Sequence, residues 1–204
     1  MTDPEKPKRV HKSAEQRREE ILTVATRIFA ERGYQVADMQ AVADAAGVGK
    51  GTVYRYFPTK EALFTEALRF NLETLKASIE HAREQPEDPL EQLREGMRAY
   101  LLYFEKNPEL IELFIQERAE FRSECQNSLY FSYMLAGRED WVDMFERIAE
   151  RHPVRDIDAQ EWMEVCGDMM HGAVVLSHTP LPRRPLSERF DRIFDIYLHG
   201  ILKH

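Results

Sequence analysis

Four side chains suited to contact with nucleic acid lie within six residues, between Lys50 and Arg55, and Lys60 follows five residues later. The guanidinium of Arg and the ammonium of Lys bond phosphate oxygens and guanine edges, and hydroxyl groups bond phosphate oxygens. The four side chains are those of Lys50, Thr52, Tyr54 and Arg55. This combination in so short a stretch predicts contact with both the backbone and the base edges of nucleic acid.

Two short helical patterns are placed to present these side chains, with a break between them at residues 47–49, Gly-Val-Gly. The first pattern has one apolar face, made by Met39, Val42, Ala43 and Ala46. In the second, Val53 and Phe57 stand four apart and leave the polar residues on the other side. Two short helices joined by a tight glycine-containing turn predict a helix-turn-helix whose second helix fits the major groove.

The flanking segments carry recognisable helix ends. Ser13 followed by Gln16 is a capping box, and Gly33 is typical of a helix end, so a helix is expected over 13–33. Asp38 is expected to cap the next helix. A core face for the first helix is predicted at Ile21, Ala25, Ile28 and Phe29.

The stretch from Ile21 to Leu68 closely resembles the TetR/AcrR family of bacterial repressors. The resemblance covers about the first third of the chain. It is carried by Phe29-Ala-Glu-Arg-Gly33-Tyr34, Ala46-Gly-Val, Lys50-Gly-Thr-Val-Tyr54, Tyr56-Phe57 and Lys60-Glu-Ala-Leu63. Two positions depart from the family pattern: Asp38 stands where a phosphate-binding Thr is usual, and Gly49 stands where a Ser cap is common. We therefore do not expect a phosphate contact from position 38.

The resemblance implies an all-α, homodimeric transcriptional regulator, most often a repressor that a small lipophilic molecule releases from double-stranded operator DNA. It implies an N-terminal three-helix unit containing the helix-turn-helix and a C-terminal helical domain that binds ligand and dimerises. The residues assigned to DNA binding are Arg17, Lys50, Gly51, Thr52, Tyr54, Arg55 and Lys60.

Charge is divided along the chain in the way this organisation requires. Residues 1–60 hold eleven Lys and Arg against eight Asp and Glu, whereas residues 61–204 hold seventeen against twenty-eight, for a total of −8. We expect a basic flexible arm at 1–12, a DNA-binding domain at 13–60, and an acidic ligand-binding and dimerisation domain at 61–204.

The remainder of the chain reads as helical, with interruptions at proline and glycine. The loop 85–89, the Asn107–Pro108 pair, His152–Pro153 and the proline-rich linker 179–185 separate the expected helices. Gly137 is expected to bend or interrupt the helix it lies in. The helices are expected at about 59–83, 90–106, 110–121, 126–151, 158–178 and 186–202.

Aromatic and sulfur-containing side chains from four of these helices predict a mostly apolar effector pocket with a few polar groups. The candidates are Tyr100, Tyr103, Phe114, Arg118, Trp141, Phe145, Met163, Met170 and His171. Taken singly, each such residue is also typical of an ordinary core.

The last two helices have apolar surface wider than one stripe, which predicts burial on two sides. The resemblance implies that they pair with their copies in a four-helix dimer interface, and the alternative is a hairpin internal to a monomer. The interface is assigned to Trp162, Cys166, Met169, Phe190, Phe194, Tyr197 and Ile201.

Other chemistries have weaker support. Glu164, Asp168 and His171 share a helical face, with His178 further on, and such a set can bind metal, but a polar seam is the preferred interpretation. No catalytic motif is present, and Cys166 and His171 lie on different faces, so neither an enzyme nor a cofactor is expected.

A cytoplasmic location without a membrane span is expected, because the chain shows no signal peptide and its cysteines, Cys125 and Cys166, lack CxxC spacing. The remaining alternative function is a helical adaptor that binds proteins and has lost DNA binding.

Overall fold

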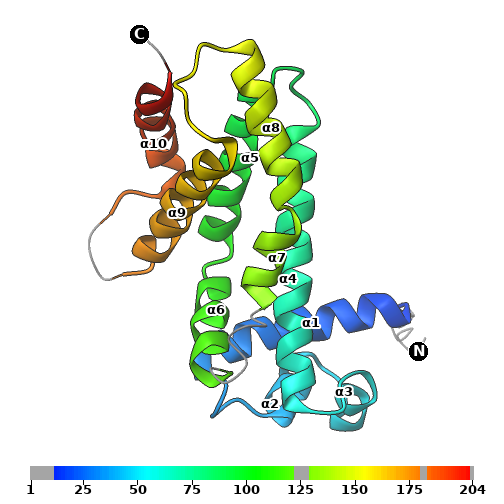
Figure 1. Cartoon of the computed structure of the whole chain (residues 1–204). Coiled ribbons are helices and arrows are strands. Elements are labelled where there is room, and N and C mark those ends of the chain that lie inside the picture. Colours follow the sequence, from blue (N-terminus) through cyan, green and yellow to red (C-terminus); the bar gives the residue numbers. More distant parts are fainter. Residues whose placement is uncertain (1–11, 122–128, 180–182, 203–204) are drawn as a thin grey trace, which may run out of the picture. The chain divides into compact units, whose positions relative to one another are not determined.

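The computed structural model describes residues 12–121, 129–179 and 183–202, and within them the protein is all-α (Figure 1). The sole exception to helix and loop in these ranges is an isolated bridge between Val154 and Leu202. The predicted fold class is confirmed. The helices are α1 (Ala14–Arg32), α2 (Met39–Ala45), α3 (Lys50–Tyr56), α4 (Lys60–Arg83), α5 (Pro89–Lys106), α6 (Glu109–Glu120), α7 (Leu129–Ala136), α8 (Arg138–Arg151), α9 (Ala159–Ser177) and α10 (Leu186–Ile201).

The chain divides into two compact units, residues 1–67 and 68–204, and the division falls within α4. Each unit has its own buried core. Among the described residues, none of the helices is long and apolar enough to cross a membrane.

In the first unit, helix α1 begins at a complete capping box. The Gln16 amide donates to Ser13 Oγ at 3.1 Å, and the Ser13 amide donates to Gln16 Oε1 at 3.0 Å. The helix ends at Gly33, whose φ of 78° lies in the left-handed region that glycine tolerates. Its buried face includes Ile21, Ala25, Ile28 and Phe29, as the apolar spacing predicts.

Helices α2 and α3 pack on each other across the turn at Gly47, where φ is 64°. The Asp38 carboxylate caps α2 and accepts from the Ala41 amide at 2.7 Å. Val53 of α3 and Phe57 just beyond it are fully buried, and they anchor the short helix in the unit. An aromatic cluster of Phe29, Tyr34 and Phe64 joins the end of α1 to the first turns of α4, with Phe29 and Phe64 edge to face at 5.1 Å.

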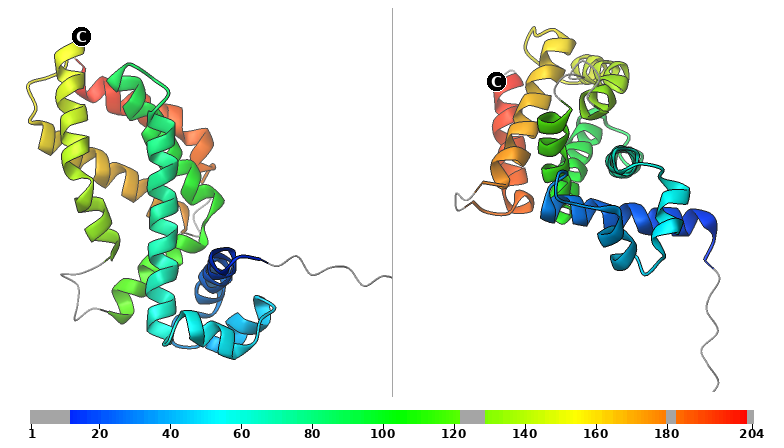
Figure 2. Two further views of the ribbon diagram at one scale, coloured as in Figure 1. Left: turned by 90° about the vertical axis from the view of Figure 1, so that its right-hand side faces the viewer. Right: turned by 90° about the horizontal axis from the view of Figure 1, so that it is seen from below.

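In the second unit, helix α5 is the central element. It lies beside α8, α9 and α10 (Figures 1 and 2). Its apolar face, which includes Leu93, Met97, Leu101 and Phe104, is almost completely buried. The core of this unit also contains buried side chains from α8, α9 and α10, namely Met144, Phe145, Ile148, Trp162, Phe190 and Phe194.

Gly96 allows a close junction of three helices in this unit. A Cβ at position 96 would lie 3.1 Å from the Arg83 side chain and 3.3 Å from the Trp141 ring. The Arg83 guanidinium carbon in turn lies 4.4 Å from the centroid of Trp141. Arg83 is therefore held between α5 and α8, and a larger residue at position 96 would separate them.

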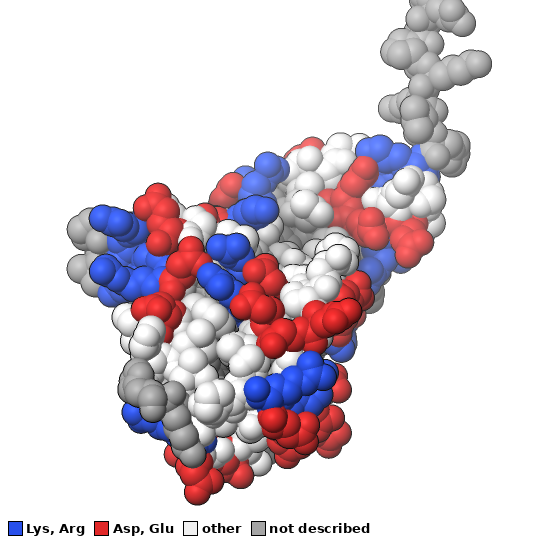
Figure 3. All heavy atoms as spheres, turned by 90° about the horizontal axis from the view of Figure 1, so that it is seen from above, with Lys and Arg blue, Asp and Glu red and all other residues white. Residues whose placement is uncertain are grey.

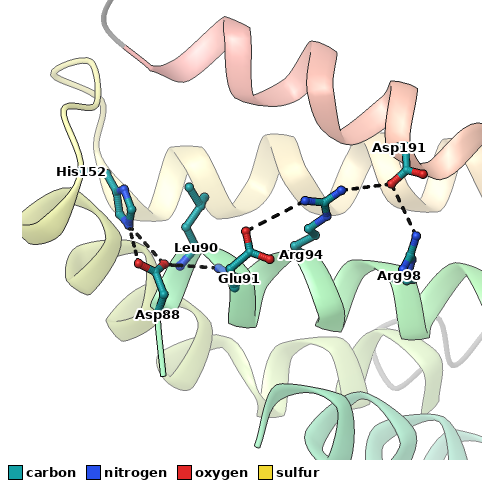
Figure 4. A network of polar contacts seen from close by, with 7 residues as sticks. All are labelled: Asp88, Leu90, Glu91, Arg94, Arg98, His152 and Asp191. Atoms are coloured by element: carbon teal, nitrogen blue, oxygen red, sulfur yellow. Dashed lines mark hydrogen bonds and ion pairs between the residues drawn. The ribbon is translucent and has the colours of Figure 1, made fainter. Parts of the chain in front are cut away.

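A network of polar contacts links the end of α8 and helix α10 to α5 (Figure 4). Asp88 caps α5 by accepting from the Leu90 amide at 2.7 Å, and His152 Nε2 at the end of α8 lies 3.1 Å from the same carboxylate. Further along α5, Asp191 of α10 lies between Arg94 and Arg98, at 3.2 and 3.5 Å. Their guanidinium groups also lie over the Phe194 and Phe190 rings, which joins polar and apolar contacts between α5 and α10.

Gly137 interrupts the helical region expected at about 126–151 and separates α7 from α8, which is one of the two outcomes expected for this glycine. The basic arm predicted at 1–12 lies outside the described residues apart from Lys12, and Cys125 is outside them as well. Over the face drawn in Figure 3, acidic and basic side chains are interspersed, with uncharged surface between them.

Replacing Asp88 with Ala should lower the free energy of unfolding by about 1 kcal/mol at neutral pH, because the cap of α5 is lost. Desolvation opposes ionisation of Asp88, but hydrogen bonds from the Leu90 and Glu91 amides and from His152 outweigh it and lower the pKa below its ordinary value of 3.8. A depressed folded-state pKa contributes stability above the unfolded-state pKa, and this stability is lost as pH falls through the folded-state pKa.

The difference between wild type and Asp88→Ala, measured by urea unfolding, should therefore be constant near neutrality and shrink below pH 3.8. Asp158→Ala is the matched control, since Asp158 caps α9 through two amides with no histidine contact recorded in the described residues. A gap between Asp88→Ala and wild type that widens on acidification would contradict the assignment.

Candidate functional site

Helix α3 exposes the residues predicted to contact nucleic acid. Lys50, Gly51 and Arg55 are exposed, Tyr54 is 44% exposed and Thr52 is partly exposed. The burial of Val53 sets this orientation, because it turns the opposite face of a seven-residue helix outward. The structure thus brings five of the seven assigned residues together on one surface.

The long cations of α3 lie against aromatic rings. Lys50 Nζ is 5.9 Å from the Tyr54 centroid, and the Arg55 guanidinium carbon is 5.5 Å from the Tyr56 centroid. Among the described residues, the contact recorded for Arg55 is this ring and not a carboxylate. Its guanidinium hydrogens therefore remain available to an acceptor outside the chain.

Lys60 has a structural role that the sequence did not indicate. Its ammonium donates to the carbonyl oxygens of Tyr34 at 2.8 Å and Gln35 at 3.2 Å, and it lies 4.7 Å from the Tyr34 centroid. These contacts tie the start of α4 to the turn after α1, within the first unit. An ammonium has three hydrogens, so two such bonds leave one for a phosphate.

The two arginines of α1 have different partners. Arg17, the seventh assigned residue, is partly exposed and lies 4.0 Å from Glu20, which also pairs with Lys12. Arg18 pairs with Glu66 of α4 and lies 5.7 Å from the Phe57 centroid. Arg18 therefore helps to hold α1 against α4, whereas the ion pair of Arg17 lies within α1.

Asp38 retains its negative charge on this unit. Its pKa is lowered below the ordinary value, chiefly by the hydrogen bond from the Ala41 amide, although desolvation opposes the shift. An ionised carboxylate repels phosphate, and this agrees with the expectation that position 38 supplies no phosphate contact.

The predicted effector-site residues fall into local clusters in the second unit. Tyr100 and Phe104 have ring centroids 4.9 Å apart, Phe104 and Phe114 are 5.8 Å apart, and Phe145 lies 4.8 Å from Trp162. Of the predicted set, Tyr100, Phe114, Phe145 and Met170 are buried, and Tyr103, Trp141, Met163 and His171 are partly exposed.

Polar groups of the set also have partners within the protein. The Tyr103 hydroxyl donates to the Asn71 carbonyl at 3.2 Å, and burial raises its pKa. Burial lowers the pKa of His171, helped by the positive charge of Arg118, while Asp168 opposes the shift. Arg118 of α6 thus acts electrostatically on His171 of α9, whereas Trp141 belongs to the separate Arg83 junction.

A charged cleft of about 490 Å³ between α4 and α8 was not predicted. Five carboxylates and two guanidinium groups line it, so it differs in character from the apolar pocket expected. The signal was present in the sequence as a polar face of α8 at helical spacing. The lining residues are Glu80, Arg83, Asp140, Asp143, Glu146, Arg147 and Glu150.

The residue assignment for the dimer interface has to be corrected. Trp162, Cys166, Phe190, Phe194 and Tyr197 are all buried within the protomer, because their sides of α9 and α10 pack on the core around α5. Met169 is partly exposed, and the side chain of Ile201 lies outside the described residues. The apolar surface that remains exposed is made by Val165, Val175 and Leu176 of α9 and Ile196 of α10.

The residues considered for metal binding and for nucleophilic catalysis have other roles in the structure. Glu164 pairs with Arg138, and His178 lies 2.8 Å from Glu112. No group of three potential metal ligands occurs among the described residues. Burial raises the pKa of the Cys166 thiol to about 12, so the thiolate needed for nucleophilic attack does not form near neutral pH.

Comparison with known proteins agrees with the geometry of the first unit. Residues 21–67 match the family described as bacterial regulatory proteins, tetR family. The transcriptional repressor KstR2 of Mycobacterium tuberculosis is 29% identical over 153 residues, which cover 74% of this chain and 76% of that protein.

Solved structures extend the similarity to the rest of the chain. The ketosteroid transcriptional regulator KstR2 of M. tuberculosis superposes with a TM-score of 0.72 at 26% identity, covering 96% of this chain and all of that one. A transcriptional regulator from Saccharomonospora viridis in complex with choline has a TM-score of 0.79 at 20% identity and covers 93% of this chain and all of its own, which shows a shared fold.

An exposed basic helix held by a helix-turn-helix, with an all-helical second unit, defines a DNA-binding transcriptional regulator. Residues 21–67 match the TetR family of bacterial regulatory proteins, and most of the chain is similar in sequence and fold to the repressor KstR2.

Lys60→Ala should lower the free energy of unfolding by about 1–2 kcal/mol, since it removes two charge-assisted hydrogen bonds to the turn carbonyls. Thermal melting followed by circular dichroism measures this. Lys76→Ala is the control. Within the described part of the chain, Lys76 forms an exposed pair with Glu80 at 3.5 Å, and its loss should cost about 0.5 kcal/mol or less. Equal melting temperatures for the two variants would show that the Lys60 contacts contribute nothing.

Proposed function

We propose that this regulator is a homodimeric repressor that reads an operator with α3 and is released from it by a small lipophilic molecule. The observation that carries the proposal is the exposed surface of α3, where two long cations and two hydroxyl groups surround the buried Val53. An adaptor without DNA binding is the weaker alternative, since it leaves this basic surface with no role.

On the DNA, Arg55 and Lys50 are assigned to base edges, where Arg to guanine is the commonest specific contact. Thr52 and Tyr54 are assigned to phosphate, with Arg17 and the remaining hydrogen of Lys60 positioning the backbone. Residues 13–60 then form the DNA-reading domain, with 1–12 as a basic arm along phosphate and 61–204 as the effector and dimerisation domain.

The effector site is assigned to the aromatic clusters of α5, α6, α8 and α9, with Arg118 and His171 as its polar groups. Aromatic walls with scarce polar groups suit a lipophilic ligand. Two relatives support a small-molecule effector by analogy: KstR2 is a ketosteroid regulator, and the S. viridis protein holds choline. Operator release would follow if ligand favours a dimer whose two α3 helices no longer match successive major grooves.

The dimer interface is assigned to the outward face of α9 and α10. Val165, Met169, Gly172 and Leu176 recur at spacings of four, three and four, so they share one side of α9. On α10, the side chain of Ile196 is 65% exposed. Large apolar side chains exposed together on neighbouring helices are typical of a surface that a partner covers.

Arg55→Ala should weaken binding to a specific duplex by about 1–3 kcal/mol per half-site. The variant should bind a scrambled duplex almost as well as the wild type does. The specific duplex is one that wild-type protein selects from a randomised pool, and affinities are measured by gel shift.

Wild-type affinity should fall with salt at a log–log slope of about −5 to −9, for roughly three to five phosphate contacts per α3 unit. Failure of the wild type to enrich any duplex would remove the proposed function, and equal losses on both duplexes would remove base reading by Arg55.

Ile196→Glu should convert the dimer to monomers, because a carboxylate buried without a partner at the interface costs about 3–5 kcal/mol. Light scattering at micromolar concentration measures the mass. Val36→Glu is the matched control, since Val36 is 73% exposed in the first unit and lies outside α9 and α10. A wild-type monomer, or a dimer that survives Ile196→Glu, would contradict the assigned interface.

A further inference from the structure

Two polar atoms in the core of the second unit lie without a hydrogen-bond partner. They are Nε1 of Trp162 on α9 and the hydroxyl oxygen of Tyr197 on α10, and neither reaches a partner at hydrogen-bonding geometry among the described residues. Trp162 is 3% exposed and Tyr197 is 6% exposed. An unpaired buried polar group costs free energy, and native proteins pair nearly all such groups with protein, water or ligand.

Other buried atoms without a partner belong to side chains that reach the surface. Arg83 Nε and Arg189 Nη1 are examples, and both side chains are partly exposed. A guanidinium has five N–H hydrogens, so one unpaired nitrogen still leaves others in contact with solvent or carboxylates. An indole and a phenol have one polar hydrogen each. Within the described ranges, the side chains that are more than nine-tenths buried and carry such an atom are Trp162 and Tyr197.

The two groups lie close together at a junction of α5, α9 and α10. Burial raises the pKa of Tyr197, the Cys166 thiol raises it further, and the Trp162 indole lowers it, so both groups lie near the hydroxyl. The Cys166 thiol itself donates to the Met97 thioether of α5, with 3.8 Å between the sulfur atoms. The groups recorded as acting on Tyr197 and Cys166 are all uncharged at neutral pH.

Two hydrogens and no charge define the ligand group that suits this junction. The indole N–H only donates, and the phenol O–H can donate as well. A carbonyl oxygen has two lone pairs and no hydrogen, so it accepts both bonds and leaves nothing unpaired. A water molecule would bring two hydrogens, for which the nearby sulfur atoms are weak acceptors. A carboxylate would be a buried charge without a cation, which is costly.

We propose that Trp162 and Tyr197 bind the carbonyl oxygen of the effector, which is a neutral lipophilic ketone or ester. This inference rests on the proposed function and extends its effector site, because the Trp162 ring lies 4.8 Å from that of Phe145 in the same site. Met97 is unbranched and flexible, so it can repack as the ligand enters. The carbonyl would join the inner sides of α9 and α10, whose outer sides are assigned to the dimer interface.

The first test removes the Tyr197 hydroxyl in the absence of ligand. The melting temperature of Tyr197→Phe should stay level or rise, because an unpaired polar atom leaves the core. Tyr103→Phe is the matched control, since the Tyr103 hydroxyl donates to the Asn71 carbonyl at 3.2 Å, and its loss should lower the melting temperature. A fall in Tyr197→Phe as large as that in Tyr103→Phe would show that the hydroxyl already has a partner, such as a buried water, and would overturn the inference.

The second test compares two probes of nearly equal shape, cyclooctanone and methylenecyclooctane, which differ by an oxygen in place of a CH₂ group. The chain has two tryptophans, so Trp141→Phe leaves Trp162 as the fluorescent reporter. The ketone should bind at least about tenfold more tightly than the alkene and shift the Trp162 emission to longer wavelength. Adding Tyr197→Phe should lower the ketone affinity about fivefold and leave the alkene affinity unchanged.

Equal binding of the two probes, or binding of neither, would overturn the inference and leave the proposed DNA binding untouched. Selection of a duplex from the randomised pool tests the proposed function separately. A wild type that selects no duplex but prefers the ketone would overturn the repressor and retain Trp162 and Tyr197 as a carbonyl-binding site.

Discussion

The DNA-reading surface depends on the burial of Val53 and Phe57. A seven-residue helix is not stable in water by itself, because forming its first turn costs more than so few hydrogen bonds return. Helix α3 has no side-chain cap and contains a glycine, so local propensity does not stabilise it either. Each buried apolar side chain contributes about 1.5–3 kcal/mol, which is enough to fix both the existence and the orientation of α3.

The contacts around these anchors are ionic as well as apolar. Arg18 reaches Glu66, and Lys60 reaches the carbonyls after α1, so two of the basic side chains near the helix-turn-helix hold the unit together. The basic residues of this unit therefore divide into those that are exposed and available to DNA and those that stabilise the folded unit. Distances to carbonyl and carboxylate groups separate the two kinds, and residue type does not.

In the second unit, α5 has a comparable organising role. Its apolar face supplies the core, and its polar face meets His152 through Asp88 and Asp191 through Arg94 and Arg98. Because α9 and α10 pack on α5, their largest side chains turn inward and the smaller Val165, Leu176 and Ile196 remain outside. The exposed apolar surface of α9 and α10 is thus composed of medium-sized aliphatic residues, and the aromatic ones stabilise the protomer.

The sequence by itself determined the all-α fold, the capping of α1 and α2, the break at Gly47 and the basic face of α3. These are local properties: a capping box, a positive-φ glycine and an apolar spacing of three or four residues act within one or two turns. Only the tertiary structure decided which side of α9 and α10 is buried, because both sides carry apolar residues and periodicity does not rank them. The partners of Lys60, Arg18 and Arg83, and the charged cleft beside α8, likewise depend on segments that are distant in sequence and meet only in the folded chain.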